Sequence, residues 1–318
     1  MAVTLADHAL QSSDKYEKAV VKRFTQTSDL LKFMPFKKIN GDTYRYRQEE
    51  VAPGVSWRDV NEPFPESTGV LAPRVENLQI VGGDVFMDDF ILETQGTGED
   101  AINEKAHQYD MKARSMAREI ERAAFEGDPL VDPSEMMGLR SRLVGSQVIS
   151  AGTNGAQLTL ALLDSLVDAV SGDLGSLHLW MSKSHRRKVT NLVNAIGGSV
   201  VLDYTGSNRG DVNKLIPNYN GIPIHTVEDS WDFSTILAFD EITGSSAITS
   251  SIYITALSTD MGVHMIYNGP NGKTASVKDV GPTLLSAAPG MVGRIQGYYG
   301  MCVKHPKAAA RLRGILTG

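Results

Sequence analysis

The sequence predicts an α+β protein that is built around one long helix. Three observations lead to this expectation. Apolar residues recur at steps of three or four over 99–126, which is the spacing of one helix face. Shorter helical and strand-like segments alternate from residue 157 onward, and a long loop at 48–74, rich in proline and glycine, separates two strand-like runs. Helices and strands mixed in this way are typical of the α+β class.

The composition excludes several classes of protein. The 318 residues carry 31 basic and 37 acidic side chains, a net charge of −6, which argues against binding of nucleic acid through net charge. Cys302 is the single cysteine, so no intramolecular disulfide can form and a reducing compartment such as the cytoplasm is expected. The longest uncharged run, 242–259, is too rich in serine and threonine to span a membrane. No signal peptide is visible.

The first segment, 2–38, is mixed and mostly polar. Ser13 and Asp14 can cap a short helix that carries Val20 and Phe24 at a four-residue step. The apolar content of the segment is too low for an independent core. We therefore expect an arm that docks on another molecule.

The long loop at 48–74 lies between a strand candidate at 43–47, where Tyr44 and Tyr46 alternate with arginines, and a matching run at 75–86. Loops of this length are uncommon inside a compact domain, and most of them are functional or disordered. A disordered linker would lack large apolar groups, whereas this loop contains Val55, Trp57, Val60, Phe64, Val70 and Leu71. Two interpretations stay open: a projecting hairpin that buries these side chains against another molecule, or a flap folded over its own domain.

The helix at 99–126 has recognisable ends. Thr97 and Asp100 form a start that resembles a capping box, and Gly127 follows the last apolar residue. At about 1.5 Å per residue the helix would be roughly 40 Å long. Its narrow, alanine-rich apolar stripe favours a spine that lies along a sheet over a coiled-coil partner, because large residues at the a and d positions are scarce.

The remainder alternates between helices and strands. Helices are expected at 157–170 and 182–196, and a last short helix is expected at 307–312, after Pro306. Strands are expected near 177–181, 200–204, 222–227, 235–239, 251–257, 263–267 and 294–303.

No motif for catalysis is present. The chain lacks the glycine-rich phosphate loops and the GxSxG elbow, and its 7 histidines show no metal-binding spacing. Cys302 and His305, three residues apart on a predicted strand, would face opposite ways. The basic run at 183–188 is expected to be a solvated or intersubunit face. We expect no catalytic residue, no cofactor and no metal.

Several stretches, in this order along the chain, carry a resemblance to a known family. They are Pro-Gly-Val at 53–55, Glu-Ser-Thr-Gly at 66–69, the long helix and its exit at 99–128, Met-Gly-Leu at 137–139, the strand-to-helix step at 180–189, and the closing segment at 300–312. Together they resemble the major capsid proteins of tailed bacteriophages, which share the Hong Kong 97-type fold. No single stretch is very specific, and the order of the parts carries the resemblance.

The resemblance implies a division of the chain. It predicts an N-terminal arm at 1–38, an E-loop hairpin with its flanking strands at 39–96, a peripheral domain with the spine helix at 97–153, an axial domain at 154–283, and a return to the peripheral domain at 284–318. It also implies that the hairpin contacts a neighbouring subunit. The contact candidates are Tyr44, Tyr46, Val55, Trp57, Phe64, Val70 and Leu71.

By the same resemblance, the protein is expected to be a structural component of a virion. It would self-assemble in the host cytoplasm into pentamers and hexamers of an icosahedral shell around double-stranded DNA, which it would contact loosely. A portal would occupy one vertex, a decoration protein is compatible with the resemblance, and no membrane is involved. The first E-loop strand starts near Thr43, which leaves no room for a fused scaffolding domain, so a separate scaffolding protein is expected. With no lysine between Lys38 and Lys105, isopeptide cross-linking by the E-loop is not expected.

Three other interpretations remain open at this stage. An encapsulin shell shares the fold and would hold cargo enzymes. An enzyme with an unrecognised site would stay monomeric and carry a ligand-binding cleft. A tail-tube protein should lack a helix as long as 99–126.

Overall fold

The computed structural model describes residues 15–94, 104–195, 202–206, 215–269, 275–282 and 290–317. The α-helices are α2 (Lys15–Thr27), α3 (Asp29–Phe33), α4 (Asp89–Thr94), α5 (Glu104–Glu126), α6 (Leu139–Arg142), α7 (Leu160–Asp168) and α8 (Lys183–Ala195). The strands are β1 (Phe36–Lys38), β2 (Thr43–Val51), β3 (Val70–Asn77), β4 (Gln79–Asp88), β5 (Val148–Ser150), β6 (Ser176–Met181), β7 (Leu202–Gly206), β8 (Leu215–Tyr219), β9 (Ile222–Thr226), β10 (Glu241–Thr243), β11 (Ser246–Leu257), β12 (Val263–Tyr267), β13 (Ser276–Pro282), β14 (Gly290–Val303) and β15 (Ala309–Leu316).

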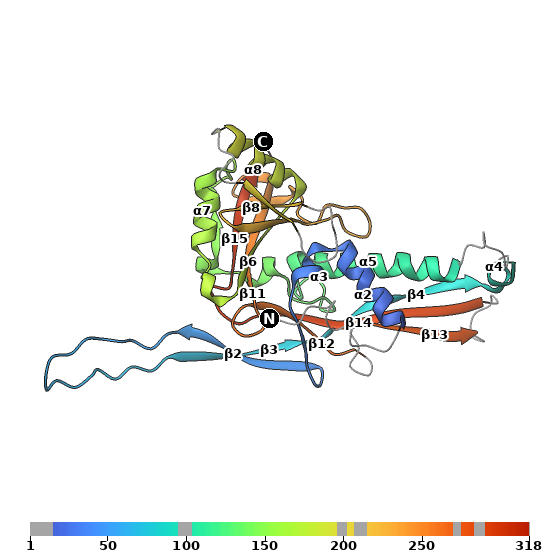
Figure 1. Cartoon of the computed structure of the whole chain (residues 1–318), viewed down its shortest axis with the longest axis horizontal. Coiled ribbons are helices and arrows are strands. Elements are labelled where there is room, and N and C mark those ends of the chain that lie inside the picture. Colours follow the sequence, from blue (N-terminus) through green and yellow to red (C-terminus); the bar gives the residue numbers. More distant parts are fainter. Residues whose placement is uncertain are drawn as a thin grey trace.

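The elements form three parts (Figure 1). The ribbon region consists of α5 and the long strands β4, β13 and β14 that run beside it. The α7–α8 region stands at one end of the ribbon region and contains these two helices with β6, β8, β9, β11 and β15. The hairpin, made of β2, β3 and the connecting residues 52–69, extends in the opposite direction from the ribbon region. We call all described residues outside the hairpin the body.

The spine of the ribbon region is α5, 23 residues long, and it confirms the predicted long helix over 104–126. Half of its apolar buried residues are alanines, in line with the alanine-rich stripe of the prediction: Tyr109, Ala113, Met116, Ala117, Ile120, Ala123, Ala124 and Phe125. The helix ends before Gly127, where a Cβ would collide with the carbonyl oxygens of Met136 and Ala123. Position 127 therefore requires glycine, because the neighbouring carbonyl oxygens leave no space for a side chain. The expected start at 99, with its cap at Thr97 and Asp100, lies outside the described residues.

The sheet beneath α5 is built from strands that are distant in sequence. β4 and β14 pair antiparallel over ten positions, from Gly290 opposite Asp88 to Tyr299 opposite Gln79, and β13 pairs with the other side of β14. The predicted single run at 75–86 is in fact two strands, because β3 pairs with β2 while β4 joins β14. The chain therefore passes from the hairpin into the body at Leu78.

In the α7–α8 region, both helices pack on one face of the sheet. Leu163 and Leu166 of α7 and Val189 and Val193 of α8 share one core cluster with residues of β6, β9, β11 and β15. The predicted helices are confirmed over 160–168 and 183–195, and the strands near 177–181, 222–227, 251–257 and 263–267 are confirmed as β6, β9, β11 and β12.

Two predicted elements are wrong. The expected helix at 307–312 is the strand β15, which pairs antiparallel with β11. Ala309, Ala310 and Leu312 are fully buried, so pairing with β11 and burial override the helix propensity of an alanine-rich stretch. The expected strand at 235–239 is a loop whose single bridge joins Thr235 to Asp229.

The N-terminal segment also differs from the expectation of an arm that docks elsewhere. Over the described residues it packs on its own chain: α2 contacts α5, and β1 pairs in parallel with β12. Its large side chains belong to the same core cluster as the apolar face of α5. The fully or almost fully buried ones are Val21, Phe24, Leu30, Leu31 and Met34. The expected caps Ser13 and Asp14 lie outside the described residues.

Candidate intersubunit surface

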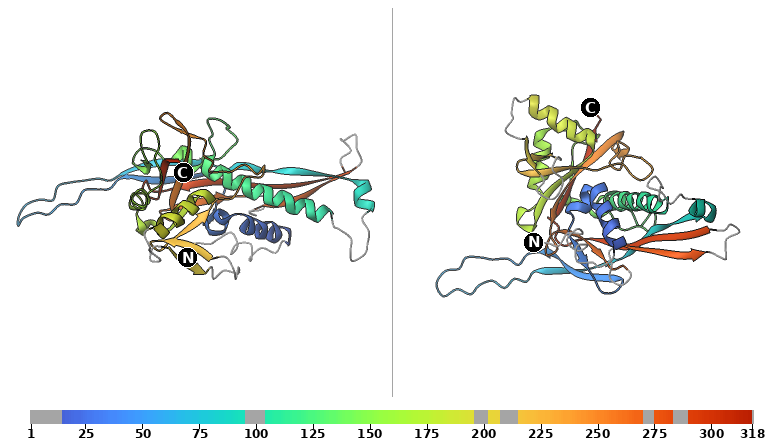
Figure 2. Two further views of the ribbon diagram at one scale, coloured as in Figure 1. Left: turned by 90° about the horizontal axis from the view of Figure 1, so that it is seen from above. Right: turned by 45° about the vertical axis from the view of Figure 1, so that its right-hand side comes forward.

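The hairpin is a projecting arm and not a flap. Its stem, β2 and β3, pairs antiparallel from Thr43 opposite Asn77 to Val51 opposite Val70, with one irregularity between Glu49 and Val51. Beyond the stem, the tip (residues 52–69) continues away from the body in every view (Figures 1 and 2). The alternative of a loop folded over its own domain is therefore wrong for the isolated chain.

The apolar side chains of the tip are uncovered. Val55 is 97% exposed, Trp57 102% and Phe64 63%. Val70 and Leu71, where β3 begins, are each about half exposed, as is Val51, which lies opposite Val70. A monomeric soluble protein rarely exposes a contiguous set of large apolar groups, and such a set is typical of a surface that binds another protein.

The tip nevertheless has local order of its own. The guanidinium of Arg58 lies 4.8 Å from the ring centroid of Phe64 and donates to the carbonyl oxygens of Asp59 and Glu62 at 3.3 and 3.0 Å. The amide of Gly54 donates to Oγ of Ser67 at 2.7 Å. These bonds join the two sides of the tip, so its apolar side chains are presented in a defined arrangement.

Two of the seven predicted contact residues lie elsewhere. Tyr46 is buried, and its hydroxyl lies 3.3 Å from both the carbonyl oxygen of Val303 and the carboxylate of Glu76. Tyr44 is half-buried, stacks on Tyr46, and accepts a hydrogen bond from Lys37 at 2.9 Å. Both tyrosines face the body because the start of β2 packs against Ile266 of β12 and Cys302 of β14, so the isolated chain leaves Tyr46 little surface for a neighbouring subunit. The structure brings Val55, Trp57, Phe64, Val70 and Leu71 together on the hairpin's distal part.

A buried ion pair fixes the base of the hairpin to the body. The guanidinium of Arg142, at the end of α6, forms a two-point contact with the carboxylate of Glu76 on β3, with one N–O distance of 3.0 Å. Arg142 also donates to the carbonyl oxygen of Met301 at 3.1 Å. Both side chains are largely buried, at 12% and 16% exposed. Because bidentate arginine–carboxylate pairs restrict geometry, the pair constrains the direction in which the hairpin leaves the body.

Other exposed apolar residues were not predicted as contacts. Leu130 is 94% and Val131 85% exposed on the loop after α5, and Ile80 is 73% exposed on β4. The backbone of this loop is held by Asp128, whose carboxylate accepts from the amide of Leu130 at 3.0 Å. The sequence could have indicated that these residues are exposed, because Leu130 and Val131 lie between two Asp-Pro pairs, at 128–129 and 132–133, which are typical of a loop.

Several of the described titratable groups of the body are buried, among them Cys302 and most of the histidines. Burial raises the pKa of the Cys302 thiol to about 12, which agrees with the interpretation of a structural cysteine. His178 Nδ1 lies 2.8 Å from His225 Nε2 inside the core, and burial lowers the pKa of His178 to about 4. Among the described residues no group of three His, Cys, Asp or Glu side chains could hold a metal ion, and no described helix is both long and apolar enough to cross a membrane.

The long spine helix on a β-ribbon, the projecting two-stranded hairpin and the separate α7–α8 region together define the Hong Kong 97-type fold of viral and encapsulin shells. No protein-family model and no curated protein matches the sequence.

Solved structures with this fold cover nearly the whole chain. The holo-SrpI encapsulin complex from Synechococcus elongatus aligns with a TM-score of 0.66 at 15% identity, over 100% of this chain and 97% of that chain. The capsid of a native GTA particle aligns with a TM-score of 0.64 at 15% identity, over 92% and 90%. A chain from Mycobacterium phage Bobi aligns with a TM-score of 0.60 at 14% identity, over 90% and 89%. At these identities the likeness concerns the fold.

Proposed function

We propose that this protein is a major capsid subunit, a structural protein that self-assembles into pentamers and hexamers of an icosahedral shell around double-stranded DNA. The fold is compatible with a shell subunit, and the 23-residue helix α5 is longer than expected for a tail-tube protein. Self-assembly depends on shape and buried surface, so the proposal assigns no catalytic role to any residue.

The observation that carries the proposal is the exposed tip of the hairpin. A chain that keeps Trp57 and Val55 almost wholly in solvent needs a second molecule to cover them. Each large apolar side chain that becomes fully buried contributes about 1.5–3 kcal/mol. In a closed shell the same contact is repeated by every subunit, so a few such residues per copy suffice to stabilise the assembly.

The proposed partners follow from this role. Copies of the chain contact one another first, a separate scaffolding protein directs closure, and a portal occupies one vertex. DNA contacts the inner wall loosely, which the net charge of −6 supports, and a decoration protein is compatible with the outer face. The proposed location is the virion, after assembly in the host cytoplasm. Without a lysine in the hairpin, the shell would be held by non-covalent contacts.

An encapsulin-like compartment is the second candidate. The likeness to the SrpI encapsulin extends over 100% of this chain and 97% of that one, and the described part of the N-terminal segment, from residue 15 onward, packs into the body. In this case the shell would enclose cargo proteins in place of DNA.

Negative-stain electron microscopy of the purified chain, alone and with a co-expressed scaffolding protein, tests the proposal. Closed shells, rings or curved sheets are expected. A chain that stays monomeric at high concentration under all of these conditions contradicts a shell function. The contents of closed shells then distinguish the two candidates: a shell that encloses co-expressed protein without scaffold supports the encapsulin, whereas closure that requires scaffold supports the capsid.

A further inference from the structure

The outer face of the hairpin stem carries two arginines without partners. Tyr44 and Tyr46 point toward the body, and because side chains alternate along a strand, Arg45 and Arg47 point the other way. Both arginines are exposed, and neither has an ion-pair partner among the described residues. Val75 lies directly opposite Arg45 and is 55% exposed.

This face is therefore a two-stranded surface on which apolar and basic groups are mixed. Leu71, half exposed, extends the apolar part toward the tip, and its cross-strand neighbour Glu49 is the one acidic group there. The net charge of Arg45, Arg47 and Glu49 is +2 − 1 = +1. Nothing in the body covers the face, so a ligand for it must combine apolar surface with negative charge.

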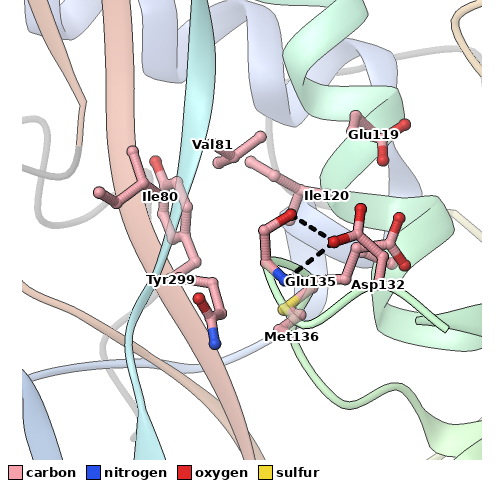
Figure 3. Close-up of a pocket in the computed structure, with 11 residues that line it drawn as sticks. Ile80, Val81, Glu119, Ile120, Asp132, Glu135, Met136 and Tyr299 are labelled. Atoms are coloured by element: carbon pink, nitrogen blue, oxygen red, sulfur yellow. Dashed lines mark hydrogen bonds between the residues drawn. The ribbon is translucent and has the colours of Figure 1, made fainter. Parts of the chain in front are cut away.

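A pocket that combines apolar surface with negative charge lies between β4, α5 and the loop that follows α5 (Figure 3). Its floor is apolar, formed by Val81, Ile120, Met136 and Tyr299. Exposed aliphatic side chains surround it: Ile80 is one of its lining residues, and Leu130 and Val131 protrude from the adjoining loop.

The rim of the pocket is acidic. Glu119, Asp132 and Glu135 line it, and Arg122 forms ion pairs with Glu119 and Glu135. The three carboxylates and the one guanidinium together carry a net charge of −3 + 1 = −2. Asp132 is exposed and is held in place by hydrogen bonds from the amide and hydroxyl of Ser134, at 2.9 and 2.7 Å. These bonds lower the pKa of Asp132, so its carboxylate remains charged at neutral pH.

We propose that the arginine face of the stem of one copy docks on this acid-rimmed pocket of a second copy. The inference rests on the proposed shell function and names the surface that receives the hairpin. Opposite charges and exposed aliphatic groups face each other in this arrangement, which favours one register of two copies. Since the two surfaces are different patches of one chain, the contact is head-to-tail, and such contacts close into rings when the rotation per subunit permits.

Cysteine cross-linking in assembled shells tests the proposal. The chain is suited to it because its natural thiol, Cys302, is buried. Three double variants combine Asp132→Cys with Arg45→Cys, Arg47→Cys or Val75→Cys, and bismaleimidohexane is the probe. At least one pair is expected to produce a ladder of covalent multimers on a denaturing gel, and each single variant is expected to stay monomeric on that gel.

The matched control pairs Asp132→Cys with Arg187→Cys, an exposed position on α8 in the α7–α8 region, and no ladder is expected from it. If wild-type shells form but none of the three stem variants gives covalent multimers, the docking inference is wrong and the proposed function is unaffected. The same holds if the control variant gives as many covalent multimers as the stem variants. Absence of any wild-type assembly overturns the proposed function itself.

A charge-reversal series provides a second measurement that needs no cross-linker. Arg47→Asp and Asp132→Arg are each expected to lower shell yield about ten-fold, because like charges then face each other. The double variant restores the pairing with reversed signs and is expected to recover most of the yield. A double variant no better than either single one contradicts the proposal. Circular dichroism of the unassembled proteins checks that all of them fold.

Discussion

The hairpin and the N-terminal segment look alike in sequence and end in opposite environments. Both are mostly polar, both contain scattered large apolar residues, and both were expected to serve neighbouring molecules. Phe24 and Leu30 of the N-terminal segment are 0% exposed, whereas Trp57 of the tip is 102% exposed. The number of apolar residues therefore does not decide whether a segment joins its own core.

The difference lies in what local structure does with those residues. In α2, Val20 and Phe24 lie on the same face of a helix at a four-residue step, and Ser28 then caps α3, which directs the next apolar residues into the core. The tip has three prolines, Pro53, Pro63 and Pro65, and no helix or strand of its own. Without a regular element its apolar groups cannot be gathered on one face against the body.

The strongest test of this comparison is Trp57→Asp. We expect loss of shell assembly, because a charge replaces the most exposed large apolar group of the tip, and we expect no change in the melting temperature of the unassembled chain. Electron microscopy and thermal denaturation measure the two effects, and Trp57→Phe serves as the control that still assembles. Unfolding of the Trp57→Asp protein would show that the tip belongs to its own domain's core.

The next largest effect is expected from Phe24→Ala. Truncation of this fully buried ring should lower the free energy of unfolding by about 3–5 kcal/mol, measured by urea denaturation of the unassembled chain. Phe64→Ala is the matched control in the tip, and its expected change is within about 0.5 kcal/mol. Equal losses in the two variants would contradict the contrast between the segments.

Lowering the pH is expected to reduce the folding stability of the body, because the body contains buried histidines. The loop at 48–74 contains no histidine, so this effect belongs to the body alone. The pKa of His178 falls from 6.5 to about 4 on folding, so the unfolded chain binds more protons between these values and stability decreases as pH falls below about 6.5. His178→Gln should flatten this dependence by up to about 1.4 kcal/mol per pH unit. Urea denaturation at pH 7, 6 and 5 measures the free energy of unfolding of both proteins. If this free energy depends on pH in the same way in wild type and in His178→Gln, His178 is not the cause of the acid sensitivity.

The smallest expected effect is that of Ser28→Ala. Its hydroxyl oxygen accepts from the amide of Leu31 at 3.3 Å and caps α3, and loss of such a cap costs about 1 kcal/mol. Ser28→Thr keeps the acceptor and should recover part of the loss in the same denaturation experiment. A neutral Ser28→Ala would mean that core packing alone positions α3.

The sequence allowed prediction of elements whose pattern is local. The apolar steps of α5 and its stop at Gly127 were readable without the structure, whereas the sequence left open whether the loop that contains Trp57 projects or folds over its own domain. Three failures share one cause, which is contact between residues that are distant in sequence. The alanine-rich stretch at 309–312 becomes a strand because β11 offers an edge, Tyr46 is buried because β2 starts against β12 and β14, and the pocket beside Ile80 is assembled from separate elements.

The single sheet that links the two regions of the body has a mechanical consequence. β11 is bonded to β6 and β15 in the α7–α8 region and turns at Gly262 into β12, which is bonded to β14 of the ribbon region. The two regions are thus joined by a short stretch of sheet, the pair Leu257 opposite Val263, and by a shared core in which Phe125 of α5 packs against Trp180 of β6 and Tyr253 of β11. Internal pressure on a wall of such subunits would load this short junction, and the packed aromatic side chains would oppose a hinge motion between the two regions.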